Sequence, residues 1–428
     1  MHRRDVPPGA LRNDTETALE RGMAAALIDR VGEGFREAFG RDPNGIWSAP
    51  GRVSVAGDHT DTQDGLSFGF ATAERTAVAV ARRDDGTITV ATDLTDERAT
   101  ADLATLRPDA EPRSWKAYPL GMIWAVVEYA RQRDRDEAGH DPNHVATDAL
   151  AICTGLDVFI STDLPVGGGL ASSASACAAV GIALSDMWHL DCSDETLADL
   201  GLRAEVAAAG AAGGVADHFT VLAATAGHDV FFDVRGRDVS LIETPDLAGA
   251  GLVTLTVGTN ELHRNWSDPF RERQEACQRV AEALGVQSLR EVRLQQLEAI
   301  EAQLDPTDLR RARYVITEIQ RTLDLTRILR TEGPEHSGPT LRASQASLRD
   351  DFEVSTERID AVCELADRAG AIGARMSGSG LGGSVFIVIP ADAVDRFTEA
   401  CVAHFDERGW GTPDVREVTP CDGPRRDV

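Results

Sequence analysis

The sequence has very little lysine: Lys116 is the only one among 428 residues, so arginine carries nearly all of the positive charge. Positive charge is also scarce overall, because 43 Lys and Arg stand against 70 Asp and Glu, a formal net charge of −27. Such a surface repels nucleic acid and anionic membranes, and we expect neither as a partner. Acidic, lysine-poor composition favours a halophilic protein whose self-repulsion is screened by salt. An ordinary acidic mesophile protein is the alternative.

The sequence also lacks paired cysteines and long apolar runs. Its seven cysteines are scattered and form no C-x-x-C, which favours reduced thiols over a disulfide framework or a zinc site. No run of 18 apolar residues occurs, and the N-terminus has no apolar segment of the signal-peptide kind. We therefore expect a cytoplasmic protein, long enough for two domains. Composition indicates no particular oligomeric state.

The most informative stretch is residues 165–177, PVGGGLASSASAC. The alternating residues 156–161 before it predict a strand, and small apolar residues after it predict a helix. Gly167, Gly168 and Gly169 permit positive φ and close approach to a ligand. The free N–H groups of a helix start favour an anion, most often phosphate. The stretch matches neither G-x-G-x-x-G nor a Walker pattern, so a ligand-free turn capped by serine is an equal alternative at this point.

A second segment, residues 51–61, concentrates polar side chains beside glycine turns. Arg52, Asp58, His59 and Asp61 fall within it, at a predicted junction of strand and loop. Such positions are suited to binding a polar ligand, although a solvated turn in an acid-rich protein has the same appearance. No second histidine or cysteine lies at metal-ligand spacing from His59.

Two acidic residues and a last glycine cluster complete the candidates. Glu205 lies on a predicted helix, 196–212, among small apolar neighbours, so it needs a partner if it is buried. Asp217 follows a glycine pair, and its simplest interpretation is the cap of a helix that begins at His218. The final cluster, residues 375–384, leads directly into a predicted strand.

In chain order, three glycine-flanked segments, residues 51–62, 165–174 and 375–384, resemble the galactokinase branch of the GHMP small-molecule kinases. Residues 51–62 are similar to the family's G-R-x-N-hydrophobic-hydrophobic-G-E-H-x-D-Y segment. Residues 165–174 are similar to its P-x-G-x-G-L-S-S-S-A phosphate loop, and residues 375–384 to its third, glycine-rich motif. The resemblance covers roughly residues 40–390, and three motifs in the right order are rarely produced by chance.

The resemblance implies a two-lobed α+β GHMP kinase fold with the active site in the cleft between the lobes. The N-terminal lobe would be of a ribosomal-protein type and the C-terminal lobe α/β. We expect residues 1–200 to form the first lobe, which carries the phosphate loop, and residues 201–428 to form the second.

The resemblance also implies an ATP-dependent and Mg²⁺-dependent kinase that phosphorylates the C1 hydroxyl of galactose or a closely related neutral sugar. Asp217 would act as the catalytic group on that hydroxyl, while Arg52 would pair with Asp217 and with the transferring phosphoryl group. Glu205, with Ser173 or Ser172, would bind Mg²⁺, which prefers oxygen ligands. The residues implied to bind ATP and its phosphates are Gly167, Gly168, Gly169, Leu170, Ser172, Ser173 and Ala174.

The sugar-side residues implied by the resemblance are Asp58, His59, Asp61, Gly214 and Phe270. Several positions depart from the family pattern. On the sugar side, Ser54 stands for Asn, Asp58 for Glu, Thr62 for Tyr, and Phe270 for a tyrosine that contacts the sugar. A lost hydrogen bond can change which sugar fits, so another pentose, hexose or alcohol is an alternative acceptor. A catalytically silent sugar sensor is a further alternative. The presence of Arg52 and Glu205 together with Asp217 favours an enzyme.

Overall fold

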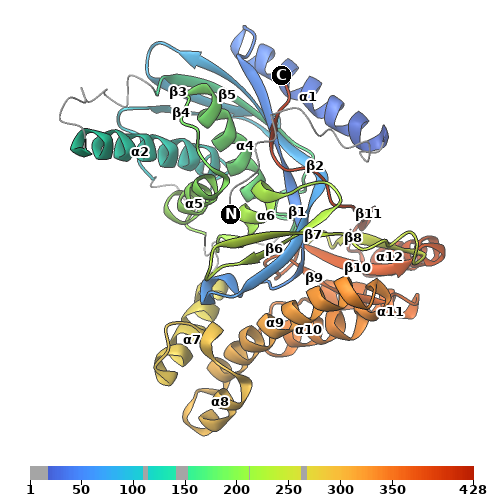
Figure 1. Cartoon of the computed structure of the whole chain (residues 1–428). Coiled ribbons are helices and arrows are strands. Elements are labelled where there is room, and N and C mark those ends of the chain that lie inside the picture. The colour runs from blue at the N-terminus through green and yellow to red at the C-terminus, as the bar shows by residue number, and fades with distance from the viewer. Residues whose placement is uncertain (1–17, 109–113, 141–152, 212, 262–267) are drawn as a thin grey trace.

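Two β-sheets, each packed against helices, organise the chain (Figure 1). The computed structural model describes residues 18–108, 114–140, 153–211, 213–261 and 268–428. The larger sheet has eight strands and the smaller has four. This mixed arrangement agrees with the α+β architecture expected from the sequence.

The larger sheet is built from β1 (Gly45–Ala56), β2 (Leu66–Arg83), β3 (Thr87–Thr92), β4 (Thr95–Asp102), β5 (Gly155–Thr162), β6 (His228–Asp233), β7 (Asp238–Glu243) and β12 (Arg425–Arg426). The order is β12-β1-β2-β5-β3-β4, with β6 joined to β2 and β7 to β6. Only β3 and β5 pair in parallel. The long strand β2 is central, because it pairs with β1 on one side and with both β5 and β6 on the other.

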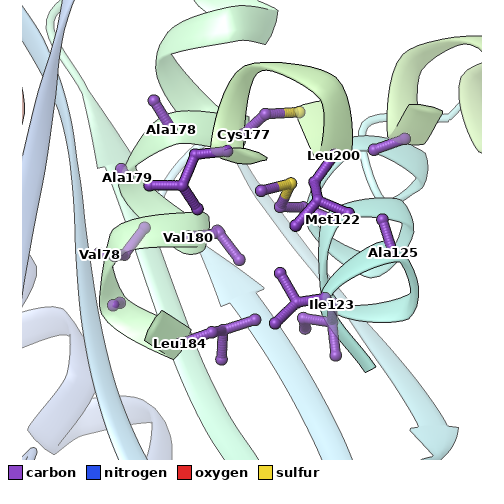
Figure 2. Close-up of a cluster of buried hydrophobic side chains, with 14 of the residues drawn as sticks. Val78, Met122, Ile123, Ala125, Cys177, Ala178, Ala179, Val180, Leu184 and Leu200 are labelled. Carbon is purple, nitrogen blue, oxygen red and sulfur yellow. The ribbon is translucent and has the colours of Figure 1, made fainter. Parts of the chain in front are cut away.

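Helices cover both faces of this sheet, and their bounds are α1 (Ala18–Phe39), α2 (Ala117–His140), α4 (Ser172–Met187), α5 (Asp194–Ala204) and α6 (Ala216–Ala223). Buried apolar residues of α1 pack on one face, and α2, α4, α5 and α6 form the main core on the other. Figure 2 shows Val180 and Leu184 of α4 facing Met122 and Ile123 of α2. The small residues of α4 permit this close approach: a Cβ at Gly181 would lie 2.5 Å from Cε of Met122.

The smaller sheet is antiparallel and consists of β8 (Leu252–Gly258), β9 (Gly373–Ser377), β10 (Ser384–Pro390) and β11 (Asp414–Glu417). Its order is β11-β8-β10-β9. The accompanying helices are α7 (Asp268–Leu284), α8 (Leu294–Ala299), α9 (Pro306–Thr331), α10 (Gly338–Asp350), α11 (Glu357–Arg368) and α12 (Val394–Arg408). The long helix α9 begins at a cap in which the Asp305 carboxylate accepts from the N–H groups of Thr307 and Asp308.

The sheets do not divide at residue 200, where the sequence suggested a boundary between lobes. Strands β6 and β7 follow that residue but extend the larger sheet through β2, and β12 near the C-terminus pairs with β1. The strands of the smaller sheet begin only at β8. Backbone pairing across the whole length of the chain therefore decides which residues belong to which sheet.

All seven cysteines are free thiols, as their scatter in the sequence led us to expect. Among the helices in the described ranges, none combines the length and the apolar character needed to cross a bilayer.

Candidate active site

A cleft of about 330 Å³ brings the three glycine-flanked segments together. Most of the residues selected from the sequence line it, from Arg52 on β1 to Phe270 on α7. Gly168, Leu170 and Ala174 do not. Leu170 and Ala174 are buried behind the loop, and the Gly168 carbonyl accepts a hydrogen bond from Ser384 Oγ at 2.5 Å. The other residues selected from this loop, Gly167, Gly169, Ser172 and Ser173, line the cleft.

The loop before α4 leaves the N-terminus of that helix open. Ala171 is the N-cap residue, with a left-handed φ of 54°, and no side chain caps the helix. Ser172 and Ser173 form the first turn and line the cleft, so the interpretation as a serine-capped turn is wrong. Gly169 has a φ of +84°, and a Cβ there would lie 2.9 Å from the Ser384 nitrogen. Free N–H groups and the helix dipole at this position favour a bound anion.

Arg52 and Asp217, which both line the cleft, form a bidentate ion pair. Nε and Nη2 of Arg52 lie 2.8 and 2.5 Å from the two carboxylate oxygens of Asp217, and Nη1 donates to the Gly169 carbonyl at 2.7 Å. Burial disfavours the guanidinium charge, but Asp217 above all, with Asp58 and Glu205, raises the pKa of Arg52. Asp217 lies inside the first turn of α6, so the helix-cap interpretation of this residue is wrong.

Glu205 is buried and begins a π-helical turn, Glu205–Ala209, that continues α5. Such turns are frequent at functional sites. Its Oε1 atom has no hydrogen-bond partner and lies 3.6 Å from Nε2 of His218. Burial opposes the charged imidazole, yet Glu205, Asp217 and Asp61 together raise the pKa of His218.

The oxygen donors in this part of the cleft fit Mg²⁺. No cluster of three or more His, Cys, Asp or Glu side chains suited to a metal occurs in the described ranges. Mg²⁺ is usually held by one or two protein oxygens together with waters and substrate phosphates. Glu205, with its unpartnered Oε1, and the Ser173 hydroxyl both line the cleft and provide that kind of donor.

Asp61 is packed against the loop that precedes α6. One carboxylate oxygen accepts from the Ala216 N–H at 3.2 Å and the other from the Thr62 N–H at 3.0 Å. Burial raises the pKa of Asp61 to about 6. Gly214 makes room for this carboxylate, because a Cβ at that position would lie 1.8 Å from Asp61 Oδ2. Asp61 thereby contacts the residues that lead into the first turn of α6, where Asp217 lies.

His59 and Phe270 contribute an aromatic part of the cleft wall. The His59 ring lies 6.1 Å from the Phe270 ring, in a stacked arrangement, and 4.8 Å from the Phe352 ring. Burial lowers the pKa of His59 to about 4, so the imidazole is neutral near pH 7. Its Nε2 atom has no partner. Aromatic rings and a neutral imidazole suit the apolar face and the hydroxyls of a sugar.

Asp58 is held by the third glycine motif. Its Oδ2 atom accepts from Nη2 of Arg375 at 2.5 Å, and its Oδ1 atom accepts from the Gly378 N–H at 3.1 Å. Asp58 still lines the cleft, but its carboxylate is already oriented by these two donors. Sequence reasoning missed Arg375 as its partner because the two residues are separated by 317 positions.

A further part of the cleft wall also escaped the sequence reasoning. Trp115 and Tyr118, near the start of α2, line it together with Leu94 and Val166. The side chains of Leu94 and Val166 are more than half exposed. The sequence offered one indication of Leu94 and Val166 as wall residues, namely that each is an apolar side chain in or beside a loop.

Matches to family models agree with this geometry. The chain matches the GHMP kinases N terminal domain over residues 124–225 and the GHMP kinases C terminal domain over residues 335–407. It also matches the galactokinase galactose-binding signature over residues 33–82. The fold is that of a GHMP kinase, as expected.

Curated relatives and a solved structure narrow the class. Galactokinase from Streptomyces coelicolor is 36% identical over 408 residues, covering 94% of this chain and 100% of the relative. Galactokinase from Bos taurus is 32% identical over 415 residues, covering 95% and 98%. The crystal structure of Lactococcus lactis galactokinase complexed with galactose has a TM-score of 0.81 at 25% identity, covering 94% of this chain and 100% of that one. The chain belongs to the galactokinase family.

Proposed function

We propose that this galactokinase family member transfers the γ-phosphoryl group of ATP to the anomeric C1 hydroxyl of galactose. The observation that carries the proposal is the bidentate pair of Arg52 and Asp217, which lines the same cleft as the open N-terminus of α4 and the sugar-side residues that follow β1. A phosphate donor and a hydroxyl acceptor can meet at that point. The match to the galactose-binding signature supports galactose as the acceptor.

Phosphoryl transfer depends mainly on positioning and on stabilising charge, and the cleft provides for both. The N–H groups at the start of α4 and the hydroxyls of Ser172 and Ser173 would bind the phosphates of ATP. Asp217 would orient the C1 hydroxyl and accept its proton. Arg52 would hold Asp217 in place and stabilise negative charge on the transferring group. Mg²⁺, held by Ser173 and Glu205, would neutralise further phosphate charge.

The acceptor side would use a small set of polar groups beside an aromatic wall. Asp61 and Asp58 would accept hydrogen bonds from galactose hydroxyls, and His59 and Phe270 would contact the ring. Phe270 has no hydroxyl, so a sugar hydroxyl that lies against it would find no partner there. The free thiols support a reducing, cytoplasmic setting for the enzyme.

The test is galactose-dependent ADP formation by Asp217→Asn. Removing a general base costs on the order of 10² to 10⁴ in kcat, while galactose binding measured by calorimetry should change little. Asp395→Asn, an exposed carboxylate in the first turn of α12, is the matched control and should retain full turnover. Full activity in Asp217→Asn would disprove the proposed role. Turnover of another sugar from a panel, with no turnover of galactose, would disprove galactose as the acceptor.

A further inference from the structure

The segment that carries Asp58 and His59 has an unfavourable backbone. Gly57 has a φ of +90°, and a Cβ there would lie 2.1 Å from the Leu66 carbonyl oxygen. His59 has a φ of +64°, in the left-handed region that residues with a side chain rarely adopt. Such a conformation persists only where surrounding contacts hold it.

Helix α9 supplies two of these contacts. The Tyr314 hydroxyl donates to the Asp58 carbonyl at 2.8 Å, and the Glu318 carboxylate accepts from the Gly57 N–H at 3.1 Å. Tyr314 and Glu318 are four residues apart, so they lie on one face of the helix. Both side chains are fully buried, and neither lines the cleft.

Glu318 is also joined to the Asp58 side chain, through Arg375. Nη2 of Arg375 lies 2.5 Å from Asp58 Oδ2 and 3.8 Å from Glu318 Oε1, so two carboxylates flank one buried guanidinium. Glu318 accepts in addition from Arg321 Nε at 2.7 Å and from Ser344 Oγ at 2.9 Å. Burial opposes its charge, but Arg321 and Arg375 hold the pKa of Glu318 below its usual value. The network is therefore charged, and Arg375 contacts both carboxylates through Nη2, while its Nε and Nη1 atoms have no hydrogen-bond partner.

We propose that Tyr314 and Glu318 are positioning residues for the galactose-binding segment 57–61. They act through the Asp58 carbonyl, the Gly57 N–H and Arg375, and touch neither substrate. This inference rests on the proposed function only in taking segment 57–61 to bind galactose. Helix α9 lies outside the segments matched by all three family models, and neither residue belongs to the three glycine-flanked motifs.

The first test is Tyr314→Phe, which removes one hydroxyl and keeps the ring. The Asp58 carbonyl would lose its donor, and a lost buried hydrogen bond of this kind corresponds to about a three- to tenfold effect. We expect the KM for galactose to rise by that factor, with the KM for ATP changed less than about twofold. The matched control is Thr326→Val: this buried hydroxyl on α9 bonds only to the Thr322 carbonyl of its own helix.

The second test compares Glu318→Gln with Glu318→Ala. Glutamine keeps an acceptor for the Gly57 N–H but removes the charge, whereas alanine removes both. We expect the KM for galactose to increase in the order wild type, Gln, Ala, again with a nearly constant KM for ATP. If the alanine variant fails to fold, Tyr314→Phe with its control still decides the question.

The outcomes distinguish a role in positioning segment 57–61 from a role in stabilising the fold alone. Equal changes in both KM values, or a loss of thermal stability with unchanged KM for galactose, would overturn the inference. So would identical behaviour of Tyr314→Phe and Thr326→Val. Galactose binding is also measured by calorimetry without ATP in each variant. Wild-type protein that binds galactose but does not phosphorylate it would refute the proposed reaction, while the affinity ratio of the variants would still test the positioning role.

Discussion

Asp229 should make the folded protein less stable as pH rises. It lies on β6 with 4% of its surface exposed, beside a small cavity of about 40 Å³ whose walls include Phe68 and Phe386. Burial raises the pKa of Asp229 to about 7, from 3.8, and no charged group contributes to that shift. Replacing it with asparagine, which has nearly the same shape and no charge, should therefore stabilise the protein at alkaline pH.

The size of the effect follows from the shift in pKa. One unit corresponds to 1.36 kcal/mol, so a rise of about 3 units is worth about 4 kcal/mol. The folded state binds the proton more tightly than the unfolded state. Below about pH 4 the carboxyl is protonated in both states and does not lower the free energy of unfolding. As pH rises toward 7, the cost of keeping the buried carboxyl protonated, or of charging it, lowers the free energy of unfolding. We expect Asp229→Asn to gain about 4 kcal/mol at pH 8 but only about 2 kcal/mol at pH 5.

The assay is urea unfolding of the wild type and the variant at pH 5, 6.5 and 8, with KCl held constant. Asp238→Asn is the matched control, since this carboxylate is exposed at the start of β7, the strand that pairs with β6. The control should show no pH-dependent gain. A gain in Asp229→Asn that does not grow with pH, or a loss of stability at every pH, would refute the reasoning.

Three further predictions concern the cleft and the surface. Because the pKa of Asp61 is about 6, lowering the pH through 6 protonates an acceptor for sugar hydroxyls; the KM for galactose should rise below that pH, and a flat profile from pH 5 to 8 would contradict this role. In Gly214→Ala the new Cβ would displace the Asp61 carboxylate, so kcat/KM for galactose should fall by at least about 10²-fold, whereas Gly22→Ala, with no neighbour within 4 Å, should be neutral. The net charge of −27 predicts a melting temperature that rises with KCl as screening increases; a constant melting temperature would remove the support for a halophilic origin.

Several parts of the fold and site could be predicted from local sequence. Apolar residues recur at helical spacing over residues 18–39, and α1 has those bounds. Alternation predicted the strand that became β5, and the glycine-rich stretch after it leads into α4. These features depend on the local properties of neighbouring residues, such as permitted φ, side-chain spacing and hydrogen-bonding groups. The order of the three glycine-flanked segments was then enough to identify the family.

Other features depended on contacts between distant residues. From the residues around it alone, the simplest interpretation of Asp217 was a helix cap, whereas the structure places it inside the first turn of α6, in bidentate contact with Arg52, 165 positions away. The division of the chain between the sheets was also not local, because β2 recruits β6 from beyond residue 200.

The sequence by itself determined the family, the glycine-rich loop before α4 and the acidic character of this protein, because each depends on neighbouring residues or on composition. Tertiary structure alone decided which carboxylates are buried, paired or left without a partner. Asp58 forms an ion pair with Arg375, Asp61 is buried against the loop before α6, and Asp229 is buried with no compensating charge. Burial and pairing depend on which distant segments pack together, and that packing sets the protonation and position of each acid in the folded enzyme.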